Sequence, residues 1–138
     1  MEKLVWKLRI TVLWIFLAVA MSAAMILYIM TPGVINDIIA GEMEAMEISA
    51  GVLMIFALFW LIPLIMAFLT LVLKDTANRY ANAILGLFFG VFYIVDISGH
   101  LSKGEEFGGH CLMGVAGIIV AFLIAWHAWK WPKQKNRS

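Results

Sequence analysis

The chain has 138 residues, of which 64% are hydrophobic and only 14% are charged, and its formal net charge is +1. An average soluble domain has roughly 25% charged residues, so this composition indicates an integral membrane protein. It excludes a disordered segment, an ordinary cytosolic enzyme and a second domain. The single cysteine, Cys111, excludes an internal disulfide. No basic patch points to nucleic acid as a partner.

Four apolar stretches follow one another along the chain and predict an all-α fold. They cover about residues 10–30, 48–73, 81–97 and 111–129. A membrane-spanning helix needs roughly 17–25 apolar residues. We therefore expect residues 1–138 to form a single domain in the lipid bilayer, an integral membrane four-helix transmembrane bundle with short connections and mostly antiparallel neighbours.

The first two stretches each carry a feature that bears on the fold. The beginning of the first stretch resembles a signal peptide, but the apolar run continues ten residues beyond Ala20, so we expect an uncleaved span. The second stretch contains Pro63, which removes a backbone hydrogen bond and predicts a kink near Phe59.

The connections between the stretches allow two further predictions. The loop over residues 31–47 is the longest, and its segment 34–40 is expected to form a short helix on the outer surface. Thr76 precedes the third stretch and is expected to cap the helix that begins there.

The basic residues are sorted to one side of the predicted bundle. Nine of the ten lie in the N-terminal tail, the second loop and the C-terminal tail, and only Lys103 lies on the other side. The positive-inside rule then predicts a multi-pass protein of the cell (cytoplasmic) membrane with both termini in the cytoplasm, N-in/C-in. Such a bias also argues against a transporter that inserts in both orientations.

Acids and histidines gather on the opposite, outer face, where they suggest a pocket that binds a ligand or a cation. The candidate residues are Asp96, His100, His110 and Glu47. Asp96 is the strongest, because an acid near the C-terminal end of a membrane helix needs a partner. The candidate partners of Asp96 are His100 at position i+4, Lys103 and His110. The plainer alternative is that Asp96 only ties down the third loop, and that the other acids only complement helix N-termini.

A transition-metal ion at the outer face is a second prediction for the same region. His110, Cys111 and Met113 offer one nitrogen and two sulfur ligands at the beginning of the fourth span. Together with the acids and histidines of the candidate pocket they could hold such an ion, although no ligand spacing here is diagnostic.

Small residues mark the expected helix contacts. Gly86 and Gly90 form a G-x-x-x-G motif in the third span. Such a ridge lets two helix backbones approach closely in a membrane. It predicts a compact bundle and offers one contact surface for a homo-oligomer.

Several short segments give the chain a resemblance to a known family. They are residues 8–14 (LRITVLW), 31–35 (TPGVI), 77–82 (ANRYAN) and 127–131 (HAWKW). Together they resemble a family of short four-span prokaryotic integral membrane proteins of unknown function. Members often carry a glutamate just before the proline of the second span. Residues 59–62 contain no acid here, so any role of that glutamate is absent. The resemblance implies a four-span membrane fold in a prokaryotic membrane, but it implies no activity.

The function that we expect is non-enzymatic, a bundle that binds a ligand or a cation in an outward-facing pocket of acids and histidines. The first alternative is a subunit of a small homo-oligomeric transporter or channel, which would need polar residues through the inner half of the spans. The second is a metal-dependent membrane enzyme, for which no nucleophile–base pair is evident.

Overall fold

The computed structural model describes residues 1–132, and their fold is all-α. The long helices are α1 (Glu2–Ile29), α3 (Ala50–Val72), α4 (Asp75–Ser102) and α5 (Gly109–Trp129). All four are long and apolar enough to cross a membrane, as predicted for a multi-pass membrane protein. Between α1 and α3 lie a short helix, α2 (Val34–Ile39), and a hairpin of β1 (Glu42–Met43) and β2 (Met46–Glu47).

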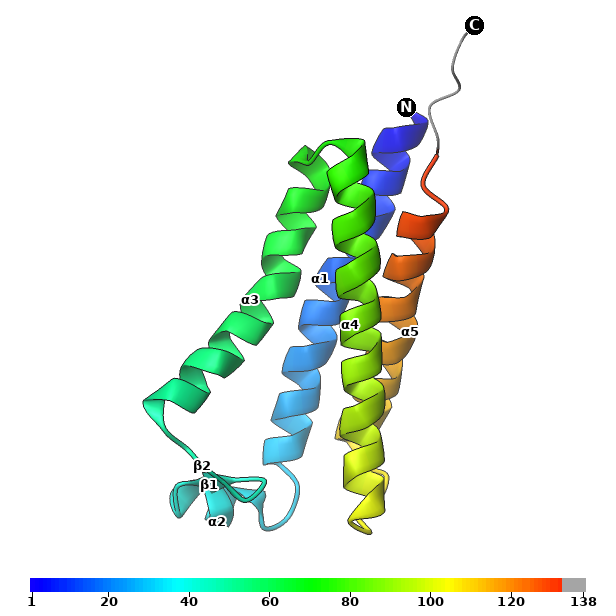
Figure 1. Ribbon diagram of the computed structural model, residues 1–138. Helices are drawn as coiled ribbons and strands as arrows, with labels where there is room; N and C mark the ends of the chain where they lie inside the picture. Colours follow the sequence, from blue (N-terminus) through cyan, green and yellow to red (C-terminus); the bar gives the residue numbers. More distant parts are fainter. Residues whose placement is uncertain (133–138) are drawn as a thin grey trace, which may run out of the picture.

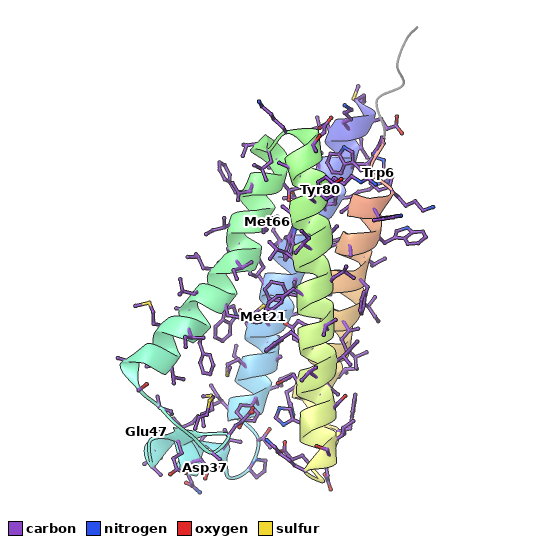
Figure 2. The ribbon with its side chains drawn as sticks, in the orientation of Figure 1. Trp6, Met21, Asp37, Glu47, Met66 and Tyr80 are labelled. Carbon is purple, nitrogen blue, oxygen red and sulfur yellow. The ribbon has the colours of Figure 1, made fainter. Side chains whose placement is uncertain are left out.

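The long helices run alternately up and down, and their connections gather at two opposite ends (Figure 1). One end holds the N-terminus, the α3–α4 turn and the end of α5, and is called the termini end here. The other holds α2, the hairpin and the α4–α5 loop, and is called the hairpin end. In Figure 2, Trp6 and Tyr80 lie toward the termini end, whereas Asp37 and Glu47 lie at the hairpin end.

Three of the helices form a tight group from which α3 departs. Helix α5 packs along both α1 and α4, and α3 packs mainly on α1. Toward the hairpin end α3 leans away from α4 (Figure 1). Pro63 lies inside α3 and is buried, at a point where a proline removes one helical hydrogen bond. The divergence of α3 leaves room between the helices in the hairpin half.

The core is continuous in the termini half of the bundle. Trp14, Leu17, Phe89 and Ile124 are completely buried, and Met21 and Met66, labelled in Figure 2, belong to the same cluster. These side chains come from all four long helices. They close the interior on the side away from the hairpin.

The glycine ridge of α4 packs on α5 within the chain. A Cβ atom on Gly86 would lie 2.9 Å from the backbone oxygen of Ala121, and one on Gly90 would lie 3.0 Å from the ring of Phe122. The distance at Gly86 is too short for a real Cβ atom, and the distance at Gly90 would require the Phe122 ring to shift, so glycine allows the closest approach. The ridge contributes to a compact bundle as predicted. It packs on α5 within the chain, and a homo-oligomer of the protein stays a prediction.

The helix ends correct two details of the sequence prediction. Helix α4 begins at Asp75 and ends at Ser102, beyond both limits of the predicted third span. Thr76 therefore lies in its first turn, and the prediction that it caps the helix was wrong. The preceding helix, α3, has a side-chain partner at its C-terminal end. Lys7 of α1 donates to the carbonyl oxygens of Leu71 and Leu73 there, which satisfies groups that a helix end leaves free.

Candidate ligand cavity and histidine cluster

A cavity of about 380 Å³ lies in the hairpin half of the bundle, where α3 leans away from α4. Residues of all four long helices and of the hairpin line it. They are Met21, Ala24, Met25, Tyr28, Met43, Glu44, Met46, Phe56, Phe59, Trp60, Phe92, Tyr93, Asp96, His100, His110 and Gly114. Its volume falls within the range of roughly 300–1,000 Å³ that is typical of small-molecule sites.

The deep part of the cavity has aromatic and methionine walls. The rings of Phe59 on α3 and Phe92 on α4 lie 4.6 Å apart, and the ring of Tyr93 lies 5.9 Å from that of Phe92. Methionines of α1 and of the hairpin complete the lining. Methionine side chains are flexible and polarisable, and aromatic rings present a negative face, so such walls suit an apolar or cationic group.

Two polar groups in these walls are buried without a partner. The hydroxyl of Tyr93 and the indole Nε1 of Trp60 make no hydrogen bond within residues 1–132. Tyr93 is only 6% exposed. A buried polar group without a partner costs about 1–3 kcal/mol. Neither atom is exposed to the cavity, so a ligand with an acceptor atom at this depth would satisfy either group only after a side-chain rotation.

Carboxylates surround a buried imidazole at the hairpin end of the cavity. His100, in the last turn of α4, is 5% exposed. Its Nδ1 lies 2.5 Å from Oε2 of Glu105, and its Nε2 lies 3.4 Å from Oε1 of Glu44 and 3.9 Å from Oδ1 of Asp96. Helix α4 continues through Ser102, which keeps Asp96 and His100 on one face one turn apart. This end of the cavity attracts positive charge.

The hairpin turn brings Glu44 to His100. Glu44 and Ala45 connect the two strands, and both have positive φ, 50° and 63°. Positive φ at both central residues is the pattern of a type I′ turn, which joins two-residue hairpins. Residues other than glycine, asparagine and aspartate rarely adopt it. The turn therefore holds an uncommon backbone conformation at the point where Glu44 reaches the imidazole.

A second imidazole lies beside the first. His110, in the first turn of α5, has its ring centroid 5.2 Å from that of His100, and Tyr28 packs near both rings at 6.0 and 5.8 Å. One ligand atom each of His100, Glu105 and His110 lies within 4.8 Å of the others. Nitrogen and carboxylate ligands at this separation could hold a metal ion.

Comparison with known proteins identifies a family but no individual relative. The model of one family matches residues 4–136. The chain belongs to DUF6326, a family of unknown function. No curated protein and no solved structure matches it. This membership agrees with the expected family of unknown function. It assigns no activity to the protein, and the features that bear on its function are those of the cavity.

The structure brings three of the four predicted pocket residues together. Asp96, His100 and His110 all line the cavity, and they form its polar end, whereas its depth is apolar. Glu47 lies elsewhere. It is exposed on β2, pairs with Glu42 across the hairpin and lines no part of the cavity. Lys103, another suggested partner of Asp96, lines a second, more polar hollow beside α2, which shares Tyr28, Glu44 and His110 with the cavity.

Two carboxylates that the sequence prediction did not single out take the place of Glu47. Glu44 reaches His100 from the hairpin turn, and Glu105 reaches it after the chain reverses at Gly104, whose φ is +77°. A glycine two residues after a helix is a signal for such a reversal. For Glu44 no comparable signal exists, because its turn lacks the glycine or asparagine that a type I′ turn favours.

The two sulfur atoms of the predicted metal site are placed differently. Cys111 is buried, and its Sγ lies 3.3 Å from Nε2 of His110. Met113 lines neither hollow of the hairpin end. The three side chains whose ligand atoms all lie within 4.8 Å of one another, His100, Glu105 and His110, offer nitrogen and oxygen atoms.

Proposed function

We propose that this DUF6326 protein is a non-enzymatic membrane binding protein that takes up a small, largely apolar ligand with a cationic group. The apolar part would lie between the aromatic and methionine walls, and the cationic group would lie at the carboxylates. We also propose that both termini are cytoplasmic, because six of the seven basic residues within residues 1–132 lie toward the termini end, and the sequence carries three more after residue 132. The polar end of the cavity would then face the outside.

The observation that carries this proposal is the polarity of one cavity along its length. Phe59, Phe92 and Tyr93 line its depth, and Glu44 and Asp96 lie at the other end. An aromatic face and a carboxylate both attract a cation. A neutral apolar ligand would use the walls alone, and a small hydrated cation would use the acids alone.

The unpartnered groups add one feature to the expected ligand. Tyr93 and Trp60 each carry a buried donor in a side chain that lines the apolar part of the cavity, and a side-chain rotation would turn this donor toward the ligand. A ligand with an ether, carbonyl or hydroxyl oxygen about midway along its length would accept a hydrogen bond there. We therefore infer that such a ligand binds more tightly than a hydrocarbon of the same shape.

A closed core favours binding over conduction. Below the cavity, toward the termini end, Ile10, Trp14, Leu17 and Phe89 are all 0% exposed. A channel or transporter subunit needs a water-accessible path through this region. The polar side chains buried there, Thr70, Asn78 and Asn82, are all 0% exposed and hydrogen-bonded to one another. The static arrangement supports a pocket that opens from one side of the bundle.

The experiment compares a cation with its neutral isostere. The protein in lipid nanodiscs is titrated with benzyltrimethylammonium or with neopentylbenzene, in which carbon replaces the nitrogen. Binding is followed by the fluorescence of Trp60, with Trp60→Phe as the blank. We expect saturable binding of the cation, weaker binding of the neutral probe, and an affinity for the cation at least tenfold lower in the double variant Glu44→Gln, Asp96→Asn.

Glu47→Gln is the matched control, because Glu47 lies on the same hairpin but outside the cavity. It should bind the cation like the unchanged protein. Equal affinity for both probes, or equal losses in the control and the double variant, would contradict the proposal.

A further inference from the structure

We infer that His100, Glu105 and His110 form a site for a divalent transition-metal ion, such as Zn²⁺, which joins the end of α4 to the beginning of α5. The inference does not rest on the proposed organic ligand. It rests on two imidazoles and a carboxylate that three separate chain positions bring to one point.

The separations of the ligand atoms are close to those that a metal needs. Metal–ligand bonds of about 2.1 Å at tetrahedral angles place ligand atoms roughly 3.4 Å apart. The ligand atoms of the three side chains lie within 4.8 Å of one another, and Nδ1 of His100 and Oε2 of Glu105 lie 2.5 Å apart. Small side-chain rotations would open the shortest distance and close the longer ones. No movement of the helices is required.

The scaffold around the three side chains is built from ordered elements. His100 is buried in the last turn of α4, and His110 lies in the first turn of α5. The ring of Tyr28, on α1, packs near both imidazoles. Glu105 follows the reversal at Gly104. An ion at this point would fix the short α4–α5 loop against both helices.

The second nitrogen of His100 lies near two carboxylates, and a small side-chain rotation would make either one the hydrogen-bond partner that a metal-bound histidine requires. A histidine that binds a metal through one ring nitrogen usually donates the other N–H to a carboxylate. If Nδ1 binds the ion, Nε2–H faces Oε1 of Glu44 at 3.4 Å and Oδ1 of Asp96 at 3.9 Å. Glu44 is then a positioning residue, which holds the imidazole in the tautomer that the metal needs.

The charge of this end and the types of ligand indicate which ion would bind. Between residues 31 and 49 and between 96 and 110 the sequence has seven acids and one basic residue, Lys103. A divalent cation would offset part of this negative charge. Two imidazoles favour Zn²⁺, Cu²⁺ or Ni²⁺ over Mg²⁺ and Ca²⁺, which prefer oxygen ligands alone.

The test measures Zn²⁺ binding to tag-free, chelator-treated protein in detergent by isothermal titration calorimetry. We expect one ion per chain and an affinity at least 100-fold lower in His110→Gln and Glu105→Gln. His127→Gln is the matched control, because His127 lies at the other end of the bundle on α5, and it should bind like the unchanged protein. Equal affinity of His110→Gln and the unchanged protein would overturn the inference.

Thermal unfolding separates loss of the site from loss of the fold. His110 is only partly buried, so His110→Gln without metal should melt near the metal-free unchanged protein. Zn²⁺ should raise the melting temperature of the unchanged protein, because an ion that binds only the folded state stabilises it. It should not raise that of His110→Gln, and an equal rise in both would contradict the site.

Cobalt substitution tests the ligand set itself. Co²⁺ bound by nitrogen and oxygen should give visible d–d bands without a thiolate charge-transfer band, and Cys111→Ser should leave this spectrum unchanged. If the thiolate band appears and Cys111→Ser removes it, Cys111 is a ligand and the set His100, Glu105 and His110 is wrong. An absence of any Zn²⁺ binding would also overturn the inference.

Discussion

The indole Nε1 of Trp14 donates a hydrogen bond of 2.6 Å to Oδ1 of Asn82. It joins α1 to α4, although no Cα atoms of these helices lie within 8 Å of each other. Both side chains are fully buried. Two side chains thus bridge a distance that the helix backbones leave open, in the apolar interior of the termini half.

This hydrogen bond belongs to a buried polar network. The hydroxyl of Thr70 also lies near Oδ1 of Asn82, at 3.1 Å, and the side-chain amide of Asn82 donates to Asn78. The amide of Asn78 donates in turn to the backbone oxygen of Thr70. The network ties α1, α3 and α4 together at one depth.

The first prediction concerns this network. Asn82→Ala should lower the free energy of unfolding by about 1–3 kcal/mol, because Trp14 and Asn78 then keep buried groups without partners. Thermal or denaturant unfolding in detergent measures the loss. Asn36→Ala is the control, because Asn36 is exposed on α2 and its loss should be small. Equal effects of the two substitutions would show that the network contributes nothing specific.

The second prediction concerns the glycine ridge. Gly86→Ala should destabilise the protein, because its Cβ would lie 2.9 Å from backbone atoms of Ala121 and Ala125, which cannot move aside singly. Gly99→Ala on the same helix has no atom within 4 Å of the new Cβ, and it should be neutral or stabilising by up to about 1 kcal/mol. The difference between the two melting temperatures is the measurement. If Gly86→Ala melts like Gly99→Ala, α4 and α5 do not pack as closely as described.

The third prediction concerns the cavity wall. Tyr93→Phe removes a buried hydroxyl that has no partner within residues 1–132. It should therefore leave the stability of the ligand-free protein unchanged or raise it by about 1 kcal/mol. Tyr80→Phe, at an exposed position, is the control and should change little. A clear loss of stability in Tyr93→Phe alone would mean that the hydroxyl has a partner, and the expected ligand acceptor would lose its support.

The fourth prediction concerns orientation in the membrane. A reporter fused after Ser138 should be cytoplasmic, and one inserted beside Lys103 should be external, because the positive residues lie toward the termini end. Paired reporters that report activity on opposite sides of the membrane make the measurement. The reverse labelling would place the carboxylates and both histidines on the cytoplasmic side.

The histidine cluster shows how far sequence patterns reach into a site. The spacing of Asp96 and His100 indicated a shared face if the helix continued, and α4 does continue through Ser102. The presence of His110 at the beginning of α5 placed it at the same end of the bundle. Both inferences follow from helix periodicity and antiparallel connection, which are local properties of the chain.

No local rule of this kind indicates which acidic residue contacts His100. Glu44 and Glu47 are three residues apart in one hairpin, yet only Glu44 reaches His100. The turn at Glu44 and Ala45 has positive φ at both residues, a conformation that their residue types do not favour. The two-residue connection between the strands imposes this conformation, and the residue types at the turn give no signal of it.

The sequence by itself determined the four apolar helices and the sorting of charge between the two ends, because hydrophobic length and residue charge act along the chain without reference to its partners. The tertiary structure decided that Gly86 meets α5 and that Glu44 and Glu105 approach His100. It also decided that α3 leaves a cavity beside α4. These features depend on which helix faces lie together. In a membrane, side-chain packing and polar contacts select those faces, because lipid gives one apolar face no advantage over another.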